Sequence, residues 1–297
     1  MLNRIRRRLP QRVTSYLYTR KRRLGRIWSI LQTPYWRLAC QDRLNYNRHS
    51  FKPPEINVVA QDGDMELLEI GGLRIFWPRE YERRVLIGSY CEIFAPSLVN
   101  PHAYEDDDIQ VRHGDWVVDA GACEGFFTFL ALQRGANVLM IEPVPRLAAA
   151  LASTFAQEIR SGKVKLVQAA LGEEPGKGRL SMDPSSIVIS KIDSSGQEDV
   201  PIVSLDQLLS GGVIPRVDFL KMDIEGFETT AMRGAISILK EQMPRLSIAV
   251  YHEFDNARLL RDFILHYQPK YHIRFRGVFL RPGYEGGPRP FMLLGRS

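Results

Sequence analysis

Hydrophobic and polar positions follow an alternating plan from residue 114 to the end of the chain. Short apolar runs are typical of buried strands, and longer stretches with apolar residues three or four apart are typical of helices. The predicted strands cover residues 116–120, 137–142, 164–169, 217–222 and 246–251. The predicted helices cover residues 126–133, 146–160, 204–209, 227–239 and 256–267. Strands that alternate with helices predict an α/β fold: a mostly parallel sheet with helices on both faces.

The C-terminal part of this pattern predicts a hairpin. Two apolar stretches, 271–280 and 289–295, flank a loop rich in Pro and Gly. A hairpin that closes a parallel sheet implies one antiparallel strand, which we expect at the edge of the sheet. Two shorter stretches, 179–182 and 187–190, predict a second hairpin.

The chain before residue 114 contains a lead-in region, residues 51–113. The stretch 67–77 predicts a β-hairpin around the pair Gly71-Gly72. Residues 80–94 predict a helix. We therefore divide the chain into a basic N-terminal segment 1–50, this lead-in region and a domain at 114–297.

The N-terminal segment holds the basic character of the protein. Residues 1–50 contain thirteen Lys or Arg and a single acid, so the rest of the chain is acidic although the net charge is +6. A helix over 13–31 would gather Leu24, Trp28 and Leu31 on one face. A basic helix with such a face binds anionic membrane surfaces, which we expect of residues 1–40; the alternative is a helix packed on the flank of the domain. The acidic remainder makes nucleic acid an unlikely partner.

Composition favours a cytoplasmic protein, peripheral to a membrane if the basic segment binds one. No run of 18 apolar residues occurs, and the charged N-terminus lacks a secretory apolar region. The three cysteines, Cys40, Cys91 and Cys123, are too widely spaced for a zinc site or a disulfide framework.

The loop after the first domain strand carries a candidate cofactor site. Asp119 is followed by Gly121, Ala122 and Gly125, and Gly121 permits a tight turn and close approach of a ligand. Ligands bind at the carboxyl ends of the strands in such sheets. A carboxylate at Asp119 would repel a pyrophosphate and attract the cationic amino-acid part of S-adenosylmethionine, so it favours that cofactor over a dinucleotide.

The next two strands add candidate contacts to an adenosine. Glu142 ends its strand roughly twenty residues after the glycines, where a carboxylate accepts both ribose hydroxyls. Gln168 and Ala169 end the third strand, and the Gln168 amide can read the edge of the base. A helix-capping Glu142 and a solvated Gln168 are the alternatives.

A second constellation lies after the later strands. Asp223 and Glu225 end one strand with i, i+2 spacing, and His252 ends the next. Carboxylates there can hold the sulfonium side, bind Mg²⁺ or take a proton, and His252 is suited to deprotonating a hydroxyl near neutral pH. The alternatives are helix capping by Glu225 and a His252 fixed against a neighbouring loop.

Together these residues resemble the FkbM family of methyltransferases over roughly residues 104–266. The resemblance is carried by the stretches 114–122, 141–143, 203–206, 220–226 and 251–252, with Gly125 and Glu228. It implies a Rossmann-like class I methyltransferase fold, with a seven-stranded, mostly parallel sheet and an antiparallel C-terminal strand. It also implies S-adenosylmethionine-dependent methyl transfer to a hydroxyl of a small molecule, sugar or glycolipid.

The sequence departs from the family pattern in two places. Cys123-Glu124 stands where an Asn-Ile-type pair is usual, and His252-Glu253 stands where related sugar methyltransferases hold Mg²⁺ with an acidic pair. Metal dependence is therefore open. Two other functions compete: a non-catalytic, membrane-associated protein that retains the fold, and a nicotinamide-dependent oxidoreductase.

Overall fold

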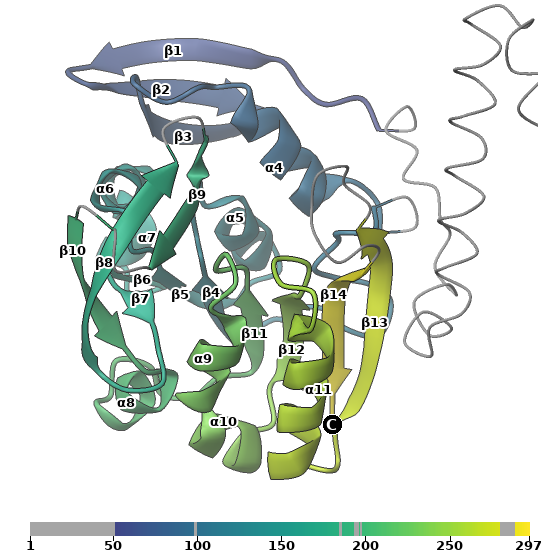
Figure 1. Ribbon diagram of the computed structural model, residues 1–297. Helices are drawn as coiled ribbons and strands as arrows, with labels where there is room; N and C mark the ends of the chain where they lie inside the picture. The colour runs from purple at the N-terminus through teal and green to yellow at the C-terminus, as the bar shows by residue number, and fades with distance from the viewer. Residues whose placement is uncertain (1–50, 98–99, 184–185, 193–195, 197, 280–288) are drawn as a thin grey trace, which may run out of the picture.

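A seven-stranded sheet forms the centre of the protein (Figure 1). The computed structural model describes residues 51–97, 100–183, 186–192, 196, 198–279 and 289–297. The strand order is β13-β14-β12-β11-β4-β5-β6. These strands are β4 (Trp116–Ala120), β5 (Asn137–Ile141), β6 (Val164–Val167), β11 (Phe219–Met222), β12 (Arg245–Ala249), β13 (His272–Phe279) and β14 (Arg289–Arg296). The predicted fold class is confirmed.

The antiparallel strand does not lie at the edge, so that expectation was wrong. β14 pairs antiparallel with both β12 and β13, and β13 forms the edge. β14 is the more apolar of the two, with Met292, Leu293 and Leu294 fully buried. An inner position covers both faces and both edges of a strand, so it suits the more apolar member of the hairpin.

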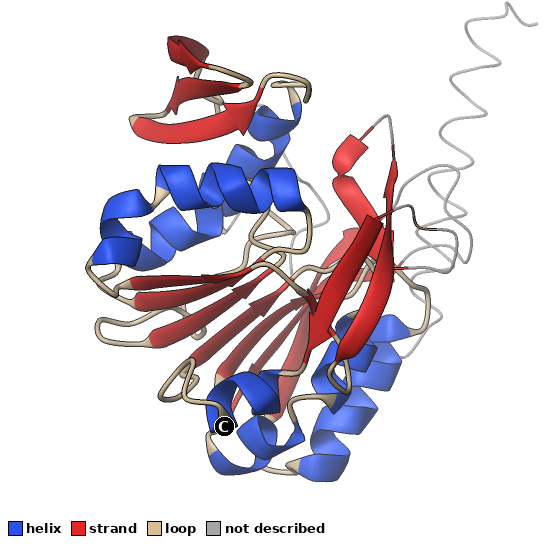
Figure 2. Ribbon diagram, turned by 90° about the vertical axis from the view of Figure 1, so that its left-hand side faces the viewer, coloured by secondary structure: helices blue, strands red, loops and turns tan. Residues whose placement is uncertain are grey.

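Helices cover both faces of the central sheet (Figure 2). One layer contains α5 (Phe126–Gln133), α6 (Pro145–Thr154) and α7 (Ala156–Arg160). The other contains α8 (Leu205–Ser210), α9 (Glu228–Arg233), α10 (Ile236–Glu241) and α11 (Asn256–Tyr267). Successive strand residues point to opposite faces, so Val117 joins the α5 side and Val118 the α9–α11 side.

Two predicted helices are broken in the structure. The stretch 146–160 divides into α6 and α7 at Phe155, whose ring is buried against Phe129. The stretch 227–239 divides into α9 and α10 after Gly234. There the Asp206 carboxylate accepts hydrogen bonds from the backbone N–H groups of Ser237 and Ile238, which caps a new helix start.

The lead-in region forms a small antiparallel sheet and one helix. β2 (Met65–Ile70) and β3 (Leu73–Pro78) pair around Gly71-Gly72, which confirms the predicted hairpin. β1 (Ile56–Asp62) was not predicted, because six of its seven residues are exposed and give no apolar alternation. α4 (Val85–Phe94) begins five residues later than predicted, since a turn from Pro78 to Tyr81 precedes it.

A second sheet lies beside the carboxyl ends of the central strands (Figure 1). Its order is β7-β10-β8-β9, with β7 (Ala170–Leu171), β8 (Gly176–Asp183), β9 (Ser186–Ile192) and β10 (Glu198–Val203). The β8–β9 hairpin was predicted; β7 and β10 were not. Leu180 and Val200 pack with Ala170 in the core under the lead-in sheet, which anchors this sheet to the domain.

The basic segment 1–50, with the helix predicted over 13–31, lies outside the described residues. Among the helices that the structure describes, none has the length and apolar character needed to cross a membrane.

Candidate functional site

A cavity opens at the carboxyl ends of β4, β5 and β11. Its space, including the part that is open to solvent, amounts to about 620 Å³. It is lined by Gly121, Cys123, Ile141, Glu142, Pro143, Leu147, Ala169, Ala170, Leu171, Leu180, Asp223, Ile224, Glu225 and Phe227. Five predicted site residues are among them: Gly121, Glu142, Ala169, Asp223 and Glu225.

The loop after β4 is held tightly against its neighbours. Gly121 adopts φ 74°, and a Cβ there would lie 1.9 Å from the Asp223 carbonyl oxygen. The N–H groups of Gly121 and Ala122 both donate to the Ile141 carbonyl, so buried Ala122 fixes the loop without lining the cavity. Gly125 also supports packing: a Cβ there would collide with Phe155 at 2.5 Å.

Asp119 lies beneath the cavity and is not part of its wall. The side chain is fully buried, with Oδ1 3.0 Å from Lys221 Nζ and Oδ2 accepting a hydrogen bond from Thr128 Oγ1 at 2.8 Å. Lys221 Nζ also donates to the Gly121 carbonyl at 2.6 Å. Lys221 and Thr128 therefore satisfy the Asp119 carboxylate within the protein, and Asp119 does not face the cavity, as a direct contact with the cofactor would require. Lys221 belongs to the 220–226 stretch, and no role was predicted for it.

Glu142, predicted to bind an adenosine, lines the cavity and is held by two backbone N–H groups. Its Oε2 accepts a hydrogen bond from Cys123 N and its Oε1 from Val144 N, both at 2.9 Å. Burial raises the pKa of Glu142 to about 7, although both backbone hydrogen bonds oppose the shift. Gln168, expected beside it at the base edge, is exposed and does not line the cavity.

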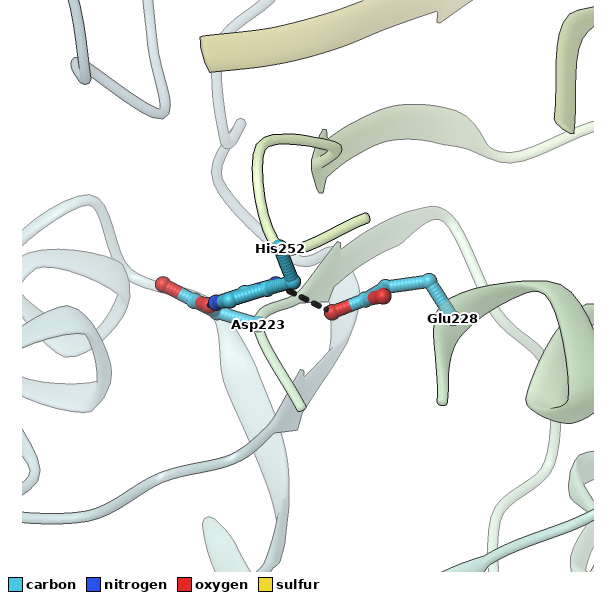
Figure 3. A group of neighbouring side chains, drawn as sticks. All are labelled: Asp223, Glu228 and His252. Carbon is cyan, nitrogen blue, oxygen red and sulfur yellow. Dashed lines mark hydrogen bonds and ion pairs between the residues drawn. The ribbon is translucent and has the colours of Figure 1, made fainter. Parts of the chain in front are cut away.

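The predicted acceptor-side residues Asp223, Glu225 and His252 meet in one cluster. His252 Nε2 lies 3.3 Å from Asp223 Oδ1 and 3.4 Å from Glu225 Oε2. Figure 3 shows His252 between Asp223 and Glu228. His252 Nδ1 lies 2.9 Å from Glu228 Oε1. Asp223 and Glu225 line the cavity, whereas the His252 side chain is only 5% exposed and lies behind them. The imidazole is thus enclosed by three carboxylates.

Glu228 organises this cluster and was not predicted as a site residue. It is fully buried, and its Oε1 accepts hydrogen bonds from the N–H groups of Ile224 and Gly226. Its Oε2 accepts one from the Asn256 amide at 2.8 Å. These bonds hold the loop after β11, in which Glu225 adopts a left-handed φ of 56°. The available signal was its place among the residues that carry the family resemblance, just after the 220–226 stretch.

Two residues of the lead-in region complete the cluster. The Tyr104 hydroxyl donates to Asp223 Oδ2, and His102 Nε2 lies 3.6 Å from the same oxygen. His102 Nδ1 lies 3.5 Å from Glu92 Oε1 on α4. Both His102 and Tyr104 are buried. Sequence reasoning missed them because they stand in an aperiodic loop more than a hundred residues from Asp223.

The cluster has two cationic imidazoles facing its carboxylates. Burial alone would lower the pKa of His252, but the carboxylate of Glu228, with those of Asp223 and Glu225, raises it to about 9. Glu92 and Asp223 likewise outweigh burial and raise the pKa of His102 to about 10. Burial would raise the pKa of Asp223, yet His102, His252 and Lys221 hold it well below its ordinary range. Asp223 is therefore ionised at neutral pH.

The cluster does not fit Mg²⁺. Asp223, Glu228 and His252 bring one ligand atom each within 4.8 Å of one another. Mg²⁺ requires oxygen ligands in near-octahedral geometry. Glu228 Oε1 already accepts two backbone N–H groups, and His252 would offer a nitrogen where the ion requires an oxygen.

The sheet, its inner antiparallel strand and this cavity define a Rossmann-like methyltransferase fold. The FkbM methyltransferase of Methylobacillus flagellatus KT superposes with a TM-score of 0.50 at 21% identity, over 71% of this chain and 50% of that chain. The model of the methyltransferase FkbM domain matches residues 119–273. Because this match spans more than half of the chain, the protein belongs to the FkbM methyltransferase domain family.

A curated relative matches a shorter part of the chain. Hexuronic acid methyltransferase AglP of Haloferax volcanii is 28% identical over 108 residues. The aligned part covers 35% of this chain and 44% of AglP, so the chain matches less than half the length of that relative.

Proposed function

We propose that the protein is an S-adenosylmethionine-dependent O-methyltransferase. The observation that carries the proposal is the charge of the cavity wall. Among the described lining residues, three are acids, Glu142, Asp223 and Glu225, and none is basic. Such a wall attracts a cationic sulfonium nucleoside and repels the pyrophosphate of a dinucleotide, which argues against a nicotinamide-dependent oxidoreductase.

The cofactor would occupy the β4–β5 side of the cavity. Gly121 and Cys123 leave backbone open to the ligand, and Glu142 presents carboxylate oxygens for the ribose hydroxyls. The apolar side chains of Ile141, Leu147 and Leu171 would face the adenine. When bound, S-adenosylmethionine supplies an electrophilic methyl group on its sulfonium.

The acceptor hydroxyl would meet Asp223. The acceptor oxygen attacks the methyl carbon, the carbon–sulfur bond breaks with its electron pair going to sulfur, and the hydroxyl proton passes to the Asp223 carboxylate. Asp223 is ionised and lines the cavity. Its low pKa makes it a weak base, but the acceptor hydroxyl becomes strongly acidic as its oxygen bonds to the methyl carbon, so the carboxylate can take the proton late in the transfer. His252, enclosed and cationic, would orient Asp223 and Glu225. This assignment moves the base from His252, the sequence-based candidate, to Asp223, and alignment of the reacting atoms supplies much of the acceleration.

We propose a hydroxyl of a small molecule, sugar or lipid-linked sugar as the acceptor. AglP acts on a hexuronic acid, which supports a sugar-type acceptor. An uncharged acceptor suits the acidic wall better than a uronate does, because like charges repel across a partly dry cavity.

The first test is binding of S-adenosylhomocysteine and of NAD to the full chain by calorimetry. We expect S-adenosylhomocysteine to bind and NAD not to bind; the reverse would overturn the proposal. The second test is transfer of label from [methyl-³H]-S-adenosylmethionine to saccharide and lipid extracts of the source cells. Asp223→Asn should retain cofactor binding and lose transfer. Cofactor binding by the wild type without transfer to any extract would instead support a non-catalytic role.

A further inference from the structure

The catalytic carboxylate proposed above has two unequal oxygens. Asp223 Oδ1 is enclosed and faces His252 Nε2 at 3.3 Å. Oδ2 accepts the Tyr104 hydroxyl in a hydrogen bond that is only partly buried, and the side chain as a whole keeps 17% exposure. Oδ2 is therefore the oxygen that faces the cavity. Its neighbours Tyr104 and His102 belong to the lead-in region and lie outside the matched family domain, residues 119–273.

Those neighbours are themselves firmly held. The Tyr104 ring packs edge-on against Phe127 and lies beneath Lys221 Nζ, 5.4 Å from the ring centre. The His102 ring stacks on Phe291 at 5.2 Å and meets Tyr251 edge-on at the same distance. Aromatic packing of this kind limits the rotamers of both side chains.

The charges around His102 come from two directions. Asp223 faces Nε2, and Glu92 on α4 faces Nδ1, with a side chain that is 46% exposed. The hydroxyl of Tyr104 lies 3.3 Å from Nε2, and Tyr251 contacts the ring face. A cation at His102 is thus balanced by one carboxylate of the cavity wall and one carboxylate at the surface.

We infer that His102 and Tyr104 are positioning residues of the methyl transfer, which fix Asp223 Oδ2 as the oxygen that takes the acceptor proton. The inference rests on the proposed function, since it assigns that proton to Asp223. A carboxylate that accepts a hydrogen bond from Tyr104 and faces the imidazolium of His102 keeps one rotamer and stays ionised until the hydroxyl proton arrives. The family domain alone, residues 119–273, would lack this arrangement.

The kinetic test compares two tyrosine variants of the full chain. Tyr104→Phe removes the donor to Asp223, whereas the matched control Tyr271→Phe removes a buried hydroxyl that donates to the Pro244 carbonyl, away from the cavity. With the labelled cofactor and the responsive extract, we expect Tyr104→Phe to lower kcat at least tenfold while the KM for S-adenosylmethionine stays within twofold. Tyr271→Phe should keep kcat. Equal effects of both variants would overturn the positioning role.

A second measurement needs no acceptor. The measurement is an NMR pH titration of ¹⁵N-histidine-labelled protein, in which the His102 signals are assigned by their loss in His102→Gln. We expect Asp223→Asn to lower the titration midpoint of His102 by at least one pH unit. Asp115→Asn, which breaks the buried pair with Arg245, should leave it unchanged. An unchanged His102 midpoint in Asp223→Asn would refute the contact. If Asp223→Asn shifts the His102 midpoint as expected but the wild type transfers no methyl group, the contact between His102 and Asp223 stands. The proposed function is then refuted, and the catalytic part of this inference with it.

Discussion

The backbone of Gly121 lies so close to that of Asp223 that a Cβ at residue 121 would come within 1.9 Å of the Asp223 carbonyl oxygen. This contact joins the cofactor side of the cavity, after β4, to its acceptor side, after β11. The absence of one side chain therefore fixes the spacing between the two halves of the site.

Gly121→Ala should damage both stability and cofactor binding. The backbone of one loop must move, and φ 74° strains any side chain, so we expect a loss of about 2–4 kcal/mol in the free energy of unfolding. Gly114→Ala is the control, because φ is 80° there but nothing lies within 4 Å of the added Cβ; it should cost about 1 kcal/mol and spare binding. Urea unfolding and calorimetry with S-adenosylhomocysteine measure both effects. Equal losses in the two variants would contradict the role of the contact.

Removal of one partner of the Lys221–Asp119 pair should lower the free energy of unfolding strongly. Asp119→Asn leaves a buried ammonium without its carboxylate, which costs about 3–5 kcal/mol in comparable buried pairs. The exposed pair between Arg146 and Asp64 is the control, and Asp64→Asn should leave the free energy of unfolding nearly unchanged, because solvent screens the pair. Urea unfolding at neutral pH provides the measurement. An Asp119→Asn protein as stable as the Asp64→Asn protein would show that the pair is not maintained in solution.

The sequence predicts elements where apolar periodicity is strong. The strand over 116–120 and the helix over 256–267 were predicted to the residue, because an almost fully buried strand and a one-sided amphipathic helix give unambiguous patterns. The exposed strand β1 and the two-residue strand β7 carry no such pattern. β1 pairs with β2 across a short turn and β7 pairs with the distant β10, so strand pairing, and not local propensity, creates them.

The site was predicted unevenly for a similar reason. Glu142, Asp223 and Glu225 follow strands, and the carboxyl ends of neighbouring parallel strands meet at one edge, so their convergence could be inferred. The pairing of Asp119 with Lys221 could not be inferred, because the sequence does not show to which side a lysine within a buried strand points. His102 also reaches Asp223 only through tertiary packing.

Cys123 predicts a stabilising substitution. It adopts a left-handed φ of 50° in the loop after β4, a conformation that Asn tolerates better than most residues and where the family pattern has Asn. Cys123→Asn should therefore raise the free energy of unfolding by about 0.5–1 kcal/mol. Cys91→Asn is the control, because Cys91 lies within helix α4, where Asn is less favourable than in a left-handed turn. Thermal unfolding in a reducing buffer distinguishes them, and a destabilised Cys123→Asn protein would show that the thiol packs too well to replace.

Glu142 predicts tighter cofactor binding as the pH rises. Burial raises its pKa from the ordinary 4.5 to about 7, so the folded protein binds this proton more tightly than the unfolded chain does. Its contribution to stability therefore falls as the pH rises from about 4.5 to about 7. A ribose that donates to the carboxylate favours the ionised form, so the Kd of S-adenosylhomocysteine should fall between pH 6 and 8. Glu142→Gln should bind weakly and without this pH dependence; a parallel pH dependence in that variant would assign the effect to another group.

Glu228 predicts a second contribution to stability that falls as the pH rises, in a higher pH range than that of Glu142. The folded state raises the pKa of His252 from 6.5 to about 9, mainly through the Glu228 carboxylate acting against burial. The stabilisation is complete below pH 6.5 and is lost as the pH rises through about 9, because neutral imidazole gains little from the carboxylate. Glu228→Gln removes the charge but keeps the size of the side chain. The difference in unfolding free energy between wild type and Glu228→Gln should therefore shrink from pH 6.5 to pH 9.5, and ¹⁵N signals of His252 should titrate at a lower pH in the variant. Glu253→Gln, on the adjacent exposed position, should show neither change. A constant difference across this pH range would mean that Glu228 stabilises the loop only through its backbone hydrogen bonds and not through the charge of His252.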